Sequence, residues 1–263
     1  MSATPPRRGA TRHPPKQRVI NSQTADEISR ANWLAEALET APIPREELLT
    51  NLGLFMSRRL LTRILFLTEL YRKILPIHGV ILEFGTRWGQ SMSIWSSLRG
   101  IYEPYNYSRR IIGFDTFAGF PSTAPQDGEN PVVTAGAYGV TPGYEAFLAE
   151  LLGYHEQQSP VSHIRKFELV AGDATQTVPA WLEAHPETVI AMAYFDFDLY
   201  EPTRACLAAI EPYLTKGSVI GFDEVNYPAF PGESVALREV LGLGRYSLRR
   251  MPYESLPSYV VIE

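Results

Sequence analysis

Four acidic residues have the types and the spacing of a site that binds a metal ion. Asp196 and Asp198 lie in the segment YFDFDLY, and Asp223 and Glu224 follow in GFDEV. If the predicted strand continues through them, Asp196 and Asp198 point to one face, because side chains along a strand repeat every two residues. Four carboxylates at neighbouring strand ends repel one another unless a cation or bound protons compensate. A hard divalent ion such as Mg²⁺ is suited to this place, since it prefers oxygen ligands.

A second candidate site is the turn in the segment ILEFGTRWG, where a predicted strand leads into a helix. Gly85 and Gly89 allow the backbone to approach a ligand closely, and the helix N-terminus suits an anionic or polar group. The dinucleotide fingerprint is not met, because Arg87 stands where a second glycine is needed, so a ligand without pyrophosphate fits better. Glu83 suits a ligand ammonium, and Asp115, at the end of the next strand, suits the two hydroxyls of a ribose. An amino acid and a nucleoside are combined in S-adenosylmethionine.

The elements that would position these residues alternate between short apolar runs and helical stretches. The runs are VILEF, RIIGFD, FELVAGD, VIAMAYFDFD and SVIGFD, which are typical of buried parallel strands and mostly end on an acid. Near the C-terminus, ESVALREVLG predicts a helix, and RYSLRR with SYVVIE predicts an antiparallel edge hairpin. The sequence therefore predicts an α/β fold with a doubly wound, mostly parallel sheet in residues 79–263.

The N-terminal part predicts helices that lead into this sheet. Residues 1–22 are rich in Pro and Arg and predict a flexible tail, because they have almost nothing to bury. Within residues 23–78, TADEISRANWLAEALETA begins with a Thr cap and acids in its first turn, as a helix does. A second helix is predicted in SRRLLTRILFLTELYRKIL. Its apolar stripe would contain Leu60, Leu61, Ile64, Leu65, Tyr71 and Ile74.

Composition excludes several classes of protein. The chain has 263 residues, 45% of them hydrophobic, which is enough for one full α/β core without a second domain. Its net charge of −5 provides no basic footprint for nucleic acid or an anionic membrane. No apolar run approaches the roughly 20 residues that span a bilayer, and no signal sequence is recognisable. Cys206 is the one cysteine and predicts an inert core thiol. We expect a cytoplasmic protein with a small-molecule partner and with neither nucleic acid nor membrane as partners.

Taken in order, the segments LEFGTRWGQS, IGFDTFAGFP, FDFDLYEPT and GFDEV resemble the macrocin O-methyltransferase family. These are Rossmann-like class I methyltransferases that modify sugars on natural products, and the resemblance covers roughly residues 55–245. It implies S-adenosylmethionine as the cofactor, with Mg²⁺ or another hard divalent cation. It also implies O-methylation of a sugar hydroxyl on a glycosylated natural product in antibiotic biosynthesis.

The resemblance also implies individual site residues. The implied cofactor positions are Glu83, Gly85, Thr86, Gly89, Ser91, Asp115, Thr116, Phe117, Asp173 and Ala174. Asp173, in VAGDA, matches the acid that commonly binds the adenine amino group. Asp196 matches the first metal carboxylate, and Asp223 and Glu224 match an adjacent pair. The family usually has two aspartates there, so the extra methylene of Glu224 leaves two alternatives: it reaches the ion directly or through water.

Proton transfer has two candidate bases and several structural alternatives. Asp196 or Asp198 would take the proton of the acceptor hydroxyl, whose pKa is lowered by metal coordination. Alternatively, Asp198 caps the helix that starts at YEPT. Asp115 has the alternative of an Asx-turn into TFAGFP, and Glu83 that of a helix cap.

The long segment at about residues 121–166 predicts a lid or acceptor-binding insertion, because it is too long for an ordinary connection. The candidates for an acceptor pocket are Tyr138, Tyr144, Phe147 and His155. A core helix is the alternative for Phe147 and Leu148, and a surface position is the alternative for His155.

Two other enzymatic functions are compatible with these motifs. One is a metal-dependent phenol or catechol O-methyltransferase, which uses the same fold and ion. The other is an oxidoreductase, since relatives on this fold are assigned to antibiotic hydroxylation, although no two-His-one-carboxylate iron pattern is visible. A non-catalytic binding protein is a further alternative, although it would be expected to lose Asp196 and Asp223, which this chain keeps. The resemblance also implies a homo-oligomer.

Overall fold

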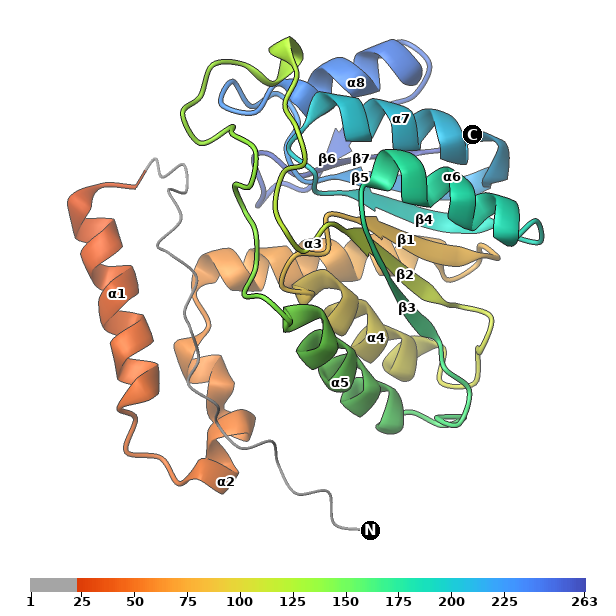
Figure 1. The fold of residues 1–263 in the computed structure, drawn as a ribbon. Helices are drawn as coiled ribbons and strands as arrows, with labels where there is room; N and C mark the ends of the chain where they lie inside the picture. Colours follow the sequence, from red (N-terminus) through yellow and green to blue (C-terminus); the bar gives the residue numbers. More distant parts are fainter. Residues whose placement is uncertain (1–22) are drawn as a thin grey trace.

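The sheet has the strand order β3-β2-β1-β4-β5-β7-β6 in the computed structural model of this chain, which describes residues 23–263 (Figure 1). The strands are β1 Val80–Phe84, β2 Ile111–Asp115, β3 Phe167–Ala171, β4 Ile190–Phe195, β5 Leu214–Phe222, β6 Arg249–Arg250 and β7 Ser258–Val261. Neighbours among β1 to β5 pair in parallel, whereas β7 is antiparallel to β5 and β6. The predicted doubly wound sheet and its antiparallel edge are confirmed. The predicted tail, residues 1–22, lies outside the described residues.

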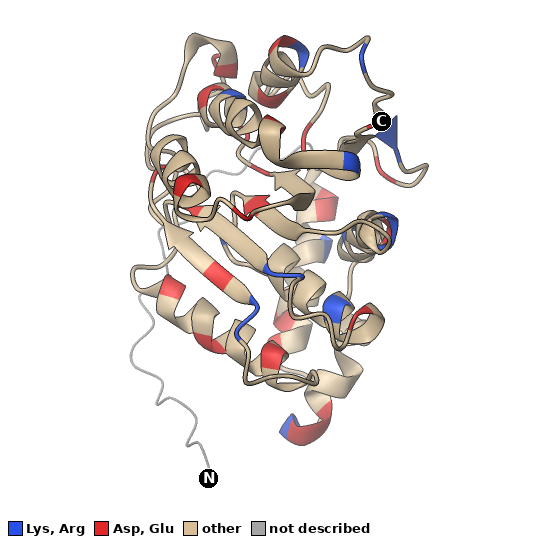
Figure 2. Cartoon of the chain, turned by 90° about the vertical axis from the view of Figure 1, so that its right-hand side faces the viewer, with Lys and Arg blue, Asp and Glu red and all other residues tan. Residues whose placement is uncertain are grey.

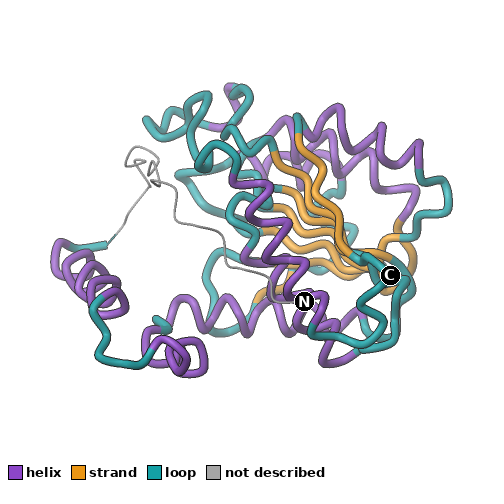
Figure 3. The backbone as a smooth tube through the Cα atoms, turned by 60° about the horizontal axis from the view of Figure 1, so that its bottom comes forward, coloured by secondary structure: helices purple, strands orange, loops and turns teal. Residues whose placement is uncertain are grey.

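Helices cover both faces of the sheet, as Figures 1 and 3 show. The α-helices are α1 Ala25–Glu39, α2 Arg45–Leu48, α3 Arg58–Ile74, α4 Gln90–Tyr102, α5 Tyr144–Gln157, α6 Ala174–Ala184, α7 Tyr200–Ile210 and α8 Gly232–Val240. Three short 3-10 helices are η1 Leu49–Phe55, η2 Pro125–Asp127 and η3 Glu211–Tyr213. One apolar cluster joins α3, α4 and α5 to the sheet, and another joins α6, α7 and α8 to its other face.

Alternation along β1 decides which side chains enter each cluster. Leu82 and Phe84 belong to the cluster with α6 to α8, whereas Ile81 belongs to the cluster with α3 to α5. Glu83 has the parity of Ile81 and therefore points toward α4 at the end of the strand. Cys206 is fully buried in α7, as predicted for a core thiol.

The N-terminal helices form as the sequence indicates, with one exception in their packing. Thr24 caps α1 in a capping box with Glu27. The stripe predicted for α3 is partly wrong, because Leu61 and Leu65 are exposed. The side chains that α3 buries are Phe66, Leu67, Leu70, Tyr71 and Ile74. Only the C-terminal half of α3 lies on the sheet, and its first turns project toward the N-terminal helices (Figure 1).

The long predicted insertion divides into two parts. Its second part contains α5, whose Leu148 and Leu152 are fully buried against α4 and the sheet. The core-helix alternative is therefore confirmed for Leu148, whereas Phe147 is exposed. A lid remains a prediction for the part before α5, which contains η2 and is named the η2 loop here, residues 121–143.

The described surface carries charges of both signs, interspersed in the view of Figure 2. Within residues 23–263, none of the helices combines the length and the apolar character that a membrane crossing requires.

Candidate active site

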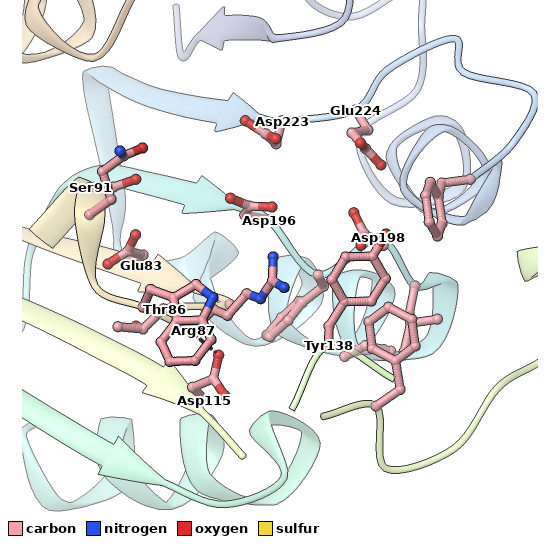
Figure 4. A pocket seen from close by; sticks show the side chains of 18 of the residues that line it. Glu83, Thr86, Arg87, Ser91, Asp115, Tyr138, Asp196, Asp198, Asp223 and Glu224 are labelled. Carbon is pink, nitrogen blue, oxygen red and sulfur yellow. Dashed lines mark hydrogen bonds between the residues drawn. The ribbon is translucent and has the colours of Figure 1, made fainter. Parts of the chain in front are cut away.

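A cavity of about 730 Å³ lies beyond the carboxyl ends of β1, β2, β4 and β5 (Figure 4). Such a volume is typical of small-molecule sites. Most of the sequence-predicted site residues line it: Glu83, Gly85, Thr86, Ser91, Asp115, Thr116, Asp173, Ala174, Asp196, Asp198, Asp223 and Glu224. Gly89 and Phe117 are not among the residues that line it.

Strand register brings the acidic residues to one level of the sheet. Phe84 pairs with Phe195, which in turn pairs with Phe222. The residues that follow the last two, Asp196 and Asp223, therefore leave the sheet side by side. This is the edge of an open parallel sheet at which ligands generally bind.

Both glycines of the first turn are required by the packing of the chain itself. Gly85 has φ +94°, and an added Cβ would lie 2.0 Å from the backbone oxygen of Asp196. Gly89 has φ +75°, and its Cβ would lie 2.3 Å from Cδ1 of Leu148 on α5. The left-handed backbone and this close approach explain glycine at both positions without a ligand.

Glu83 is a buried carboxyl group with an unused oxygen. Its side chain is 1% exposed and forms a hydrogen bond with Ser91. Oε2 is buried and has no hydrogen-bond partner among the described residues. Burial, followed by the charge of Asp196, raises the pKa of Glu83 well above its usual range. The helix-cap alternative is wrong, because Gly89 is the N-cap of α4 and no side chain caps it. An unpartnered buried carboxyl fits a cationic ligand group such as an ammonium.

Asp115 forms an Asx-turn, so that alternative is confirmed, and its side chain also lines the cavity. Its Oδ1 accepts from the amide of Phe117 at 2.6 Å, and its Oδ2 accepts from the amide of Arg87 at 2.7 Å. Both donors have a left-handed backbone, with φ +53° and +46° respectively. Burial raises the pKa of Asp115, although the two amides act in the opposite direction. Asp115 therefore fixes the two turns that border this half of the cavity.

Asp173 caps α6 and also lines the cavity. Its Oδ1 accepts from the amide and the hydroxyl of Thr175, both at 2.9 Å. Ala174 follows it as a buried residue at the start of the helix. The predicted contact with adenine stays a prediction.

Asp196 and Asp198 come together through a loop rather than along a strand. β4 ends at Phe195, so the expectation that strand alternation aligns them is wrong. Asp198 has φ +63°, which turns the chain back into the cavity. The helix-cap alternative for Asp198 is also wrong, because Leu199 is the N-cap of α7 without a side-chain bond. The first amide of α7, that of Tyr200, instead donates to Oδ1 of Asp127 at 2.5 Å.

Arg63 is a site residue that the sequence did not reveal. Its guanidinium donates to Oδ2 of Asp196 at 2.8 Å and makes a very short contact with Oδ1 of Asp223. The hydroxyl of Tyr194 also donates to Oδ1 of Asp223, at 2.5 Å. Arg63 lies 133 positions before Asp196 on α3, so no local pattern connects them.

Glu233, on α8, is a second residue that the sequence did not reveal. Its fully buried carboxyl accepts from the amides of Phe197 at 3.1 Å, Asp198 at 3.3 Å and Glu224 at 3.2 Å. One side chain thereby holds the loops after β4 and β5. No local signal marks Glu233 within ESVALREVLG, because an acid in the first turn of a helix is common whatever its partners.

The acidic cluster has a deficit of positive charge. Burial and then the charge of Asp223 raise the pKa of Asp196 to about 8, although Arg63 acts in the opposite direction. Burial raises the pKa of Glu224 to about 8 as well. The pKa of Asp198 is raised by burial and by Glu224, with which it shares a hydrogen bond.

These acids fit a hard cation in their chemistry. All the atoms that could bind the ion are carboxylate oxygens. Among them, Oε2 of Glu224 is buried without a hydrogen-bond partner among the described residues. In the present arrangement, however, residues 23–263 contain no group of three acidic, His or Cys side chains that is already placed to hold an ion. The predicted ligands Asp196, Asp223 and Glu224 therefore stay a prediction.

A further part of the cavity wall is aromatic and basic. Tyr138, from the η2 loop, lines the cavity, and the guanidinium of Arg87 lies 4.8 Å from its ring centre. Of the other acceptor-pocket candidates, Tyr144, Phe147 and His155 are not among the lining residues. Tyr144 instead donates to the carbonyl of Trp88 at 3.0 Å.

Solved structures identify the relatives of this chain. A calicheamicin methyltransferase, CalS11, is 46% identical, with a TM-score of 0.90 over 92% of this chain and 94% of its own. The apo structure of CalS11, described as a TDP-rhamnose 3'-O-methyltransferase of calicheamicin biosynthesis, is 44% identical, with a TM-score of 0.82 over 92% and 96%. The O-methyltransferase NovP shares the fold at 16% identity, with a TM-score of 0.57 over 76% and 79%. No family model matches, and no curated protein matches.

These relatives establish the class of the protein. The sheet order, the antiparallel edge and the N-terminal helices are those of the class I methyltransferase fold. The chain is a methyltransferase, so the oxidoreductase alternative is wrong. The fold implies S-adenosylmethionine as the methyl donor.

Proposed function

Because this chain belongs to the macrocin O-methyltransferase family, we propose that it transfers the methyl group of S-adenosylmethionine to a hydroxyl of a nucleotide-linked deoxysugar for antibiotic biosynthesis. The observation that carries this choice of acceptor is the likeness, along nearly the whole chain, to a methyltransferase of TDP-rhamnose. The family resemblance led us to expect a glycosylated natural product as the acceptor. The acceptor proposed here is instead the nucleotide-activated sugar, before it is attached to the natural product.

The half of the cavity at β1 and β2 is the proposed cofactor site. The unpartnered oxygen of Glu83 would accept the ammonium of the methionine part, with Ser91 beside it. The remaining lone pairs of Asp115 would accept the ribose hydroxyls, because its two amide bonds already fix the carboxylate. Asp173 and Ala174 would border the adenine.

The half of the cavity at β4 and β5 is the proposed reaction site. Asp196, Asp223 and Glu224 would hold Mg²⁺, which lowers the pKa of a bound hydroxyl when it is present. Asp198 is the proposed base, because its side chain lines the cavity at this place, whereas Asp196 is engaged by Arg63. It takes the hydroxyl proton as the oxygen attacks the methyl carbon and the carbon–sulfur bond breaks.

The nucleotide of the acceptor requires positive charge. The basic side chains that line the cavity are Arg59, Arg63 and Arg87. Arg59 and Arg87 are the proposed partners of the diphosphate, because both side chains line the cavity and a guanidinium suits phosphate oxygens. Tyr138, which belongs to the η2 loop, would contact the sugar or the base of the acceptor.

The test is methyl transfer from S-adenosylmethionine to TDP-rhamnose, followed by mass spectrometry of the sugar nucleotide. We expect a gain of one methyl group, stimulation by Mg²⁺ and loss with a chelator. Asp198→Asn should lower kcat by at least about 100-fold, because the base is removed. Asp26→Asn makes the same chemical change on exposed α1 and should leave kcat unaltered.

Calorimetry separates the parts of this proposal. S-adenosylhomocysteine should bind with and without Mg²⁺, and NAD should not bind. Asp196→Asn should retain this binding but lose the Mg²⁺-dependent turnover. Methylation of a rhamnosylated natural product but not of TDP-rhamnose would refute the acceptor while leaving the reaction class intact.

A further inference from the structure

Arg63 occupies the space between two carboxylates that the proposed function assigns to a metal ion. One of its terminal nitrogens donates to Oδ2 of Asp196 at 2.8 Å, and the other contacts Oδ1 of Asp223. The side chain is one-quarter exposed and extends from the half of α3 that does not pack on the sheet. The positive charge therefore comes from the part of α3 that lies outside the main core.

The hydrogen bonds leave no room for a metal on the same oxygen. Oδ1 of Asp223 accepts both from Arg63 and from the hydroxyl of Tyr194, which donates at 2.5 Å. A carboxylate oxygen has two lone pairs, so these two donors occupy it fully. An ion that binds this oxygen must displace one donor. Tyr194 is a fully buried strand residue, whereas Arg63 has a long and partly exposed side chain.

Charge leads to the same conclusion. A guanidinium stays protonated in proteins, so it cannot lose its charge when a cation approaches. Two cations at one pair of acids repel each other, and the divalent ion has the larger attraction for the acids. The guanidinium is then the group that leaves.

From this geometry we propose that Arg63 is a placeholder cation, which holds Asp196 and Asp223 together without metal and leaves them when a divalent ion binds. The inference deepens the proposed function and rests on it. Arg63 is thus a positioning residue whose guanidinium competes with the metal for the same oxygens. It sets the metal affinity of the site while protecting the metal-free protein from repulsion between the two acids.

The test is calorimetric titration of Mg²⁺ into the full-length protein without cofactor or acceptor. Arg63→Met keeps most of the side-chain length and removes the charge. We expect it to bind Mg²⁺ at least about tenfold more tightly than the parent protein, because two competing ion pairs are removed. Arg59→Met removes a charge that lines the same cavity one turn earlier on α3 and should change the affinity much less.

Thermal unfolding provides a second readout. Without metal, Arg63→Met should unfold at a lower temperature than the parent, and saturating Mg²⁺ should close this difference. If Arg63→Met is poorly folded, Arg63→Lys replaces it in the test. A single ammonium cannot bridge both acids as the guanidinium does, so this variant should bind Mg²⁺ with intermediate affinity.

Equal or weaker Mg²⁺ binding by these Arg63 variants would overturn the proposal. Absence of Mg²⁺ binding in every variant would overturn it too. In that case, methylation by the parent protein that persists in a chelator would show that the transferase function stands without a metal. If the parent protein does not bind S-adenosylhomocysteine, the proposed function itself is refuted.

Discussion

Glu233 sets the positions of the acidic loops through hydrogen bonds rather than through contact with a substrate. Its two oxygens accept the amides of Phe197, Asp198 and Glu224. Gln at this position has one accepting oxygen, so at least one of these amides must lose its partner; the amide of Asp198 is buried and the other two are partly buried. An unsatisfied buried donor typically destabilises a protein by about 1–3 kcal/mol.

We therefore predict that Glu233→Gln lowers both the free energy of unfolding and kcat, with little change in S-adenosylhomocysteine affinity. Urea denaturation, steady-state kinetics and calorimetry measure the three quantities. Glu201→Gln is the matched control, because Glu201 pairs with Arg204 at the exposed surface of α7. Unaltered kcat in Glu233→Gln would contradict a positioning role.

The raised pKa values of Asp196 and Glu224 predict a pH dependence for the metal-free protein. Both are near 8 when folded, well above the values of unfolded Asp and Glu. Between about pH 4 and pH 8 the folded state binds more protons, so the free energy of unfolding falls as the pH rises. Each group contributes a slope of at most about 1.4 kcal/mol per pH unit.

Glu224→Gln should reduce this slope, since the variant has one fewer group to ionise. The measurement is the urea midpoint of the metal-free parent and variant at a series of pH values in this window. Parallel curves would show that Glu224 ionises as easily when folded as when unfolded, contrary to this prediction. Saturating Mg²⁺ should also flatten the parent curve, because a cation favours the ionised acids.

At the scale of elements, the η2 loop is fixed to the core by one buried residue. Asp127 is 1% exposed, and its two oxygens accept from the amides of Tyr200 at 2.5 Å and Ala124 at 2.7 Å. It thereby joins the proposed lid to the first turn of α7. The left-handed Gly128 follows it and turns the loop back.

Asp127→Asn should loosen the η2 loop, because an amide group accepts through only one of its two terminal atoms. We expect a protease of broad specificity to cleave this loop faster in the variant. The kcat/KM for the acceptor should also fall roughly tenfold or more, because the loop no longer positions the acceptor as well. Glu129→Gln, an exposed change in the same loop, is the control. If cofactor binding alone weakens, the loop serves the cofactor instead of the acceptor.

The elements were largely predictable, whereas the contacts between them were not. Short apolar runs and the Thr24 cap have local signals, and they predicted the strands and α1 correctly. The first amide of α7 is bonded by Asp127, 73 positions away, so no local signal could decide between a base and a helix cap for Asp198. Arg63 and Glu233 were missed for the same reason, because their partners are close only in the folded chain.

At the scale of the whole molecule, the N-terminal helices have apolar side chains that the other residues of the described range, 23–263, leave exposed. α1 buries none of its residues, and Trp33 on it is 67% exposed. Leu49 and Leu54 of η1 are 74% and 67% exposed. Figure 3 shows α1 extending away from the sheet. A 15-residue helix is only marginally stable in water without packing, so a covering surface is expected.

A second copy of the chain is the predicted cover, in agreement with the homo-oligomer that the family resemblance implies. Every copy carries the same uncovered helices, so a symmetric pair can bury both sets at once. Light scattering coupled to gel filtration should give a mass above that of one chain, and Trp33→Ser should shift it toward the monomer. Leu243→Ser is the control, since Leu243 is 57% exposed beyond α8. A parent protein that is monomeric at micromolar concentration would contradict this prediction, and hydrogen exchange of α1 would then be fast, because an exposed helix of this length is only marginally stable.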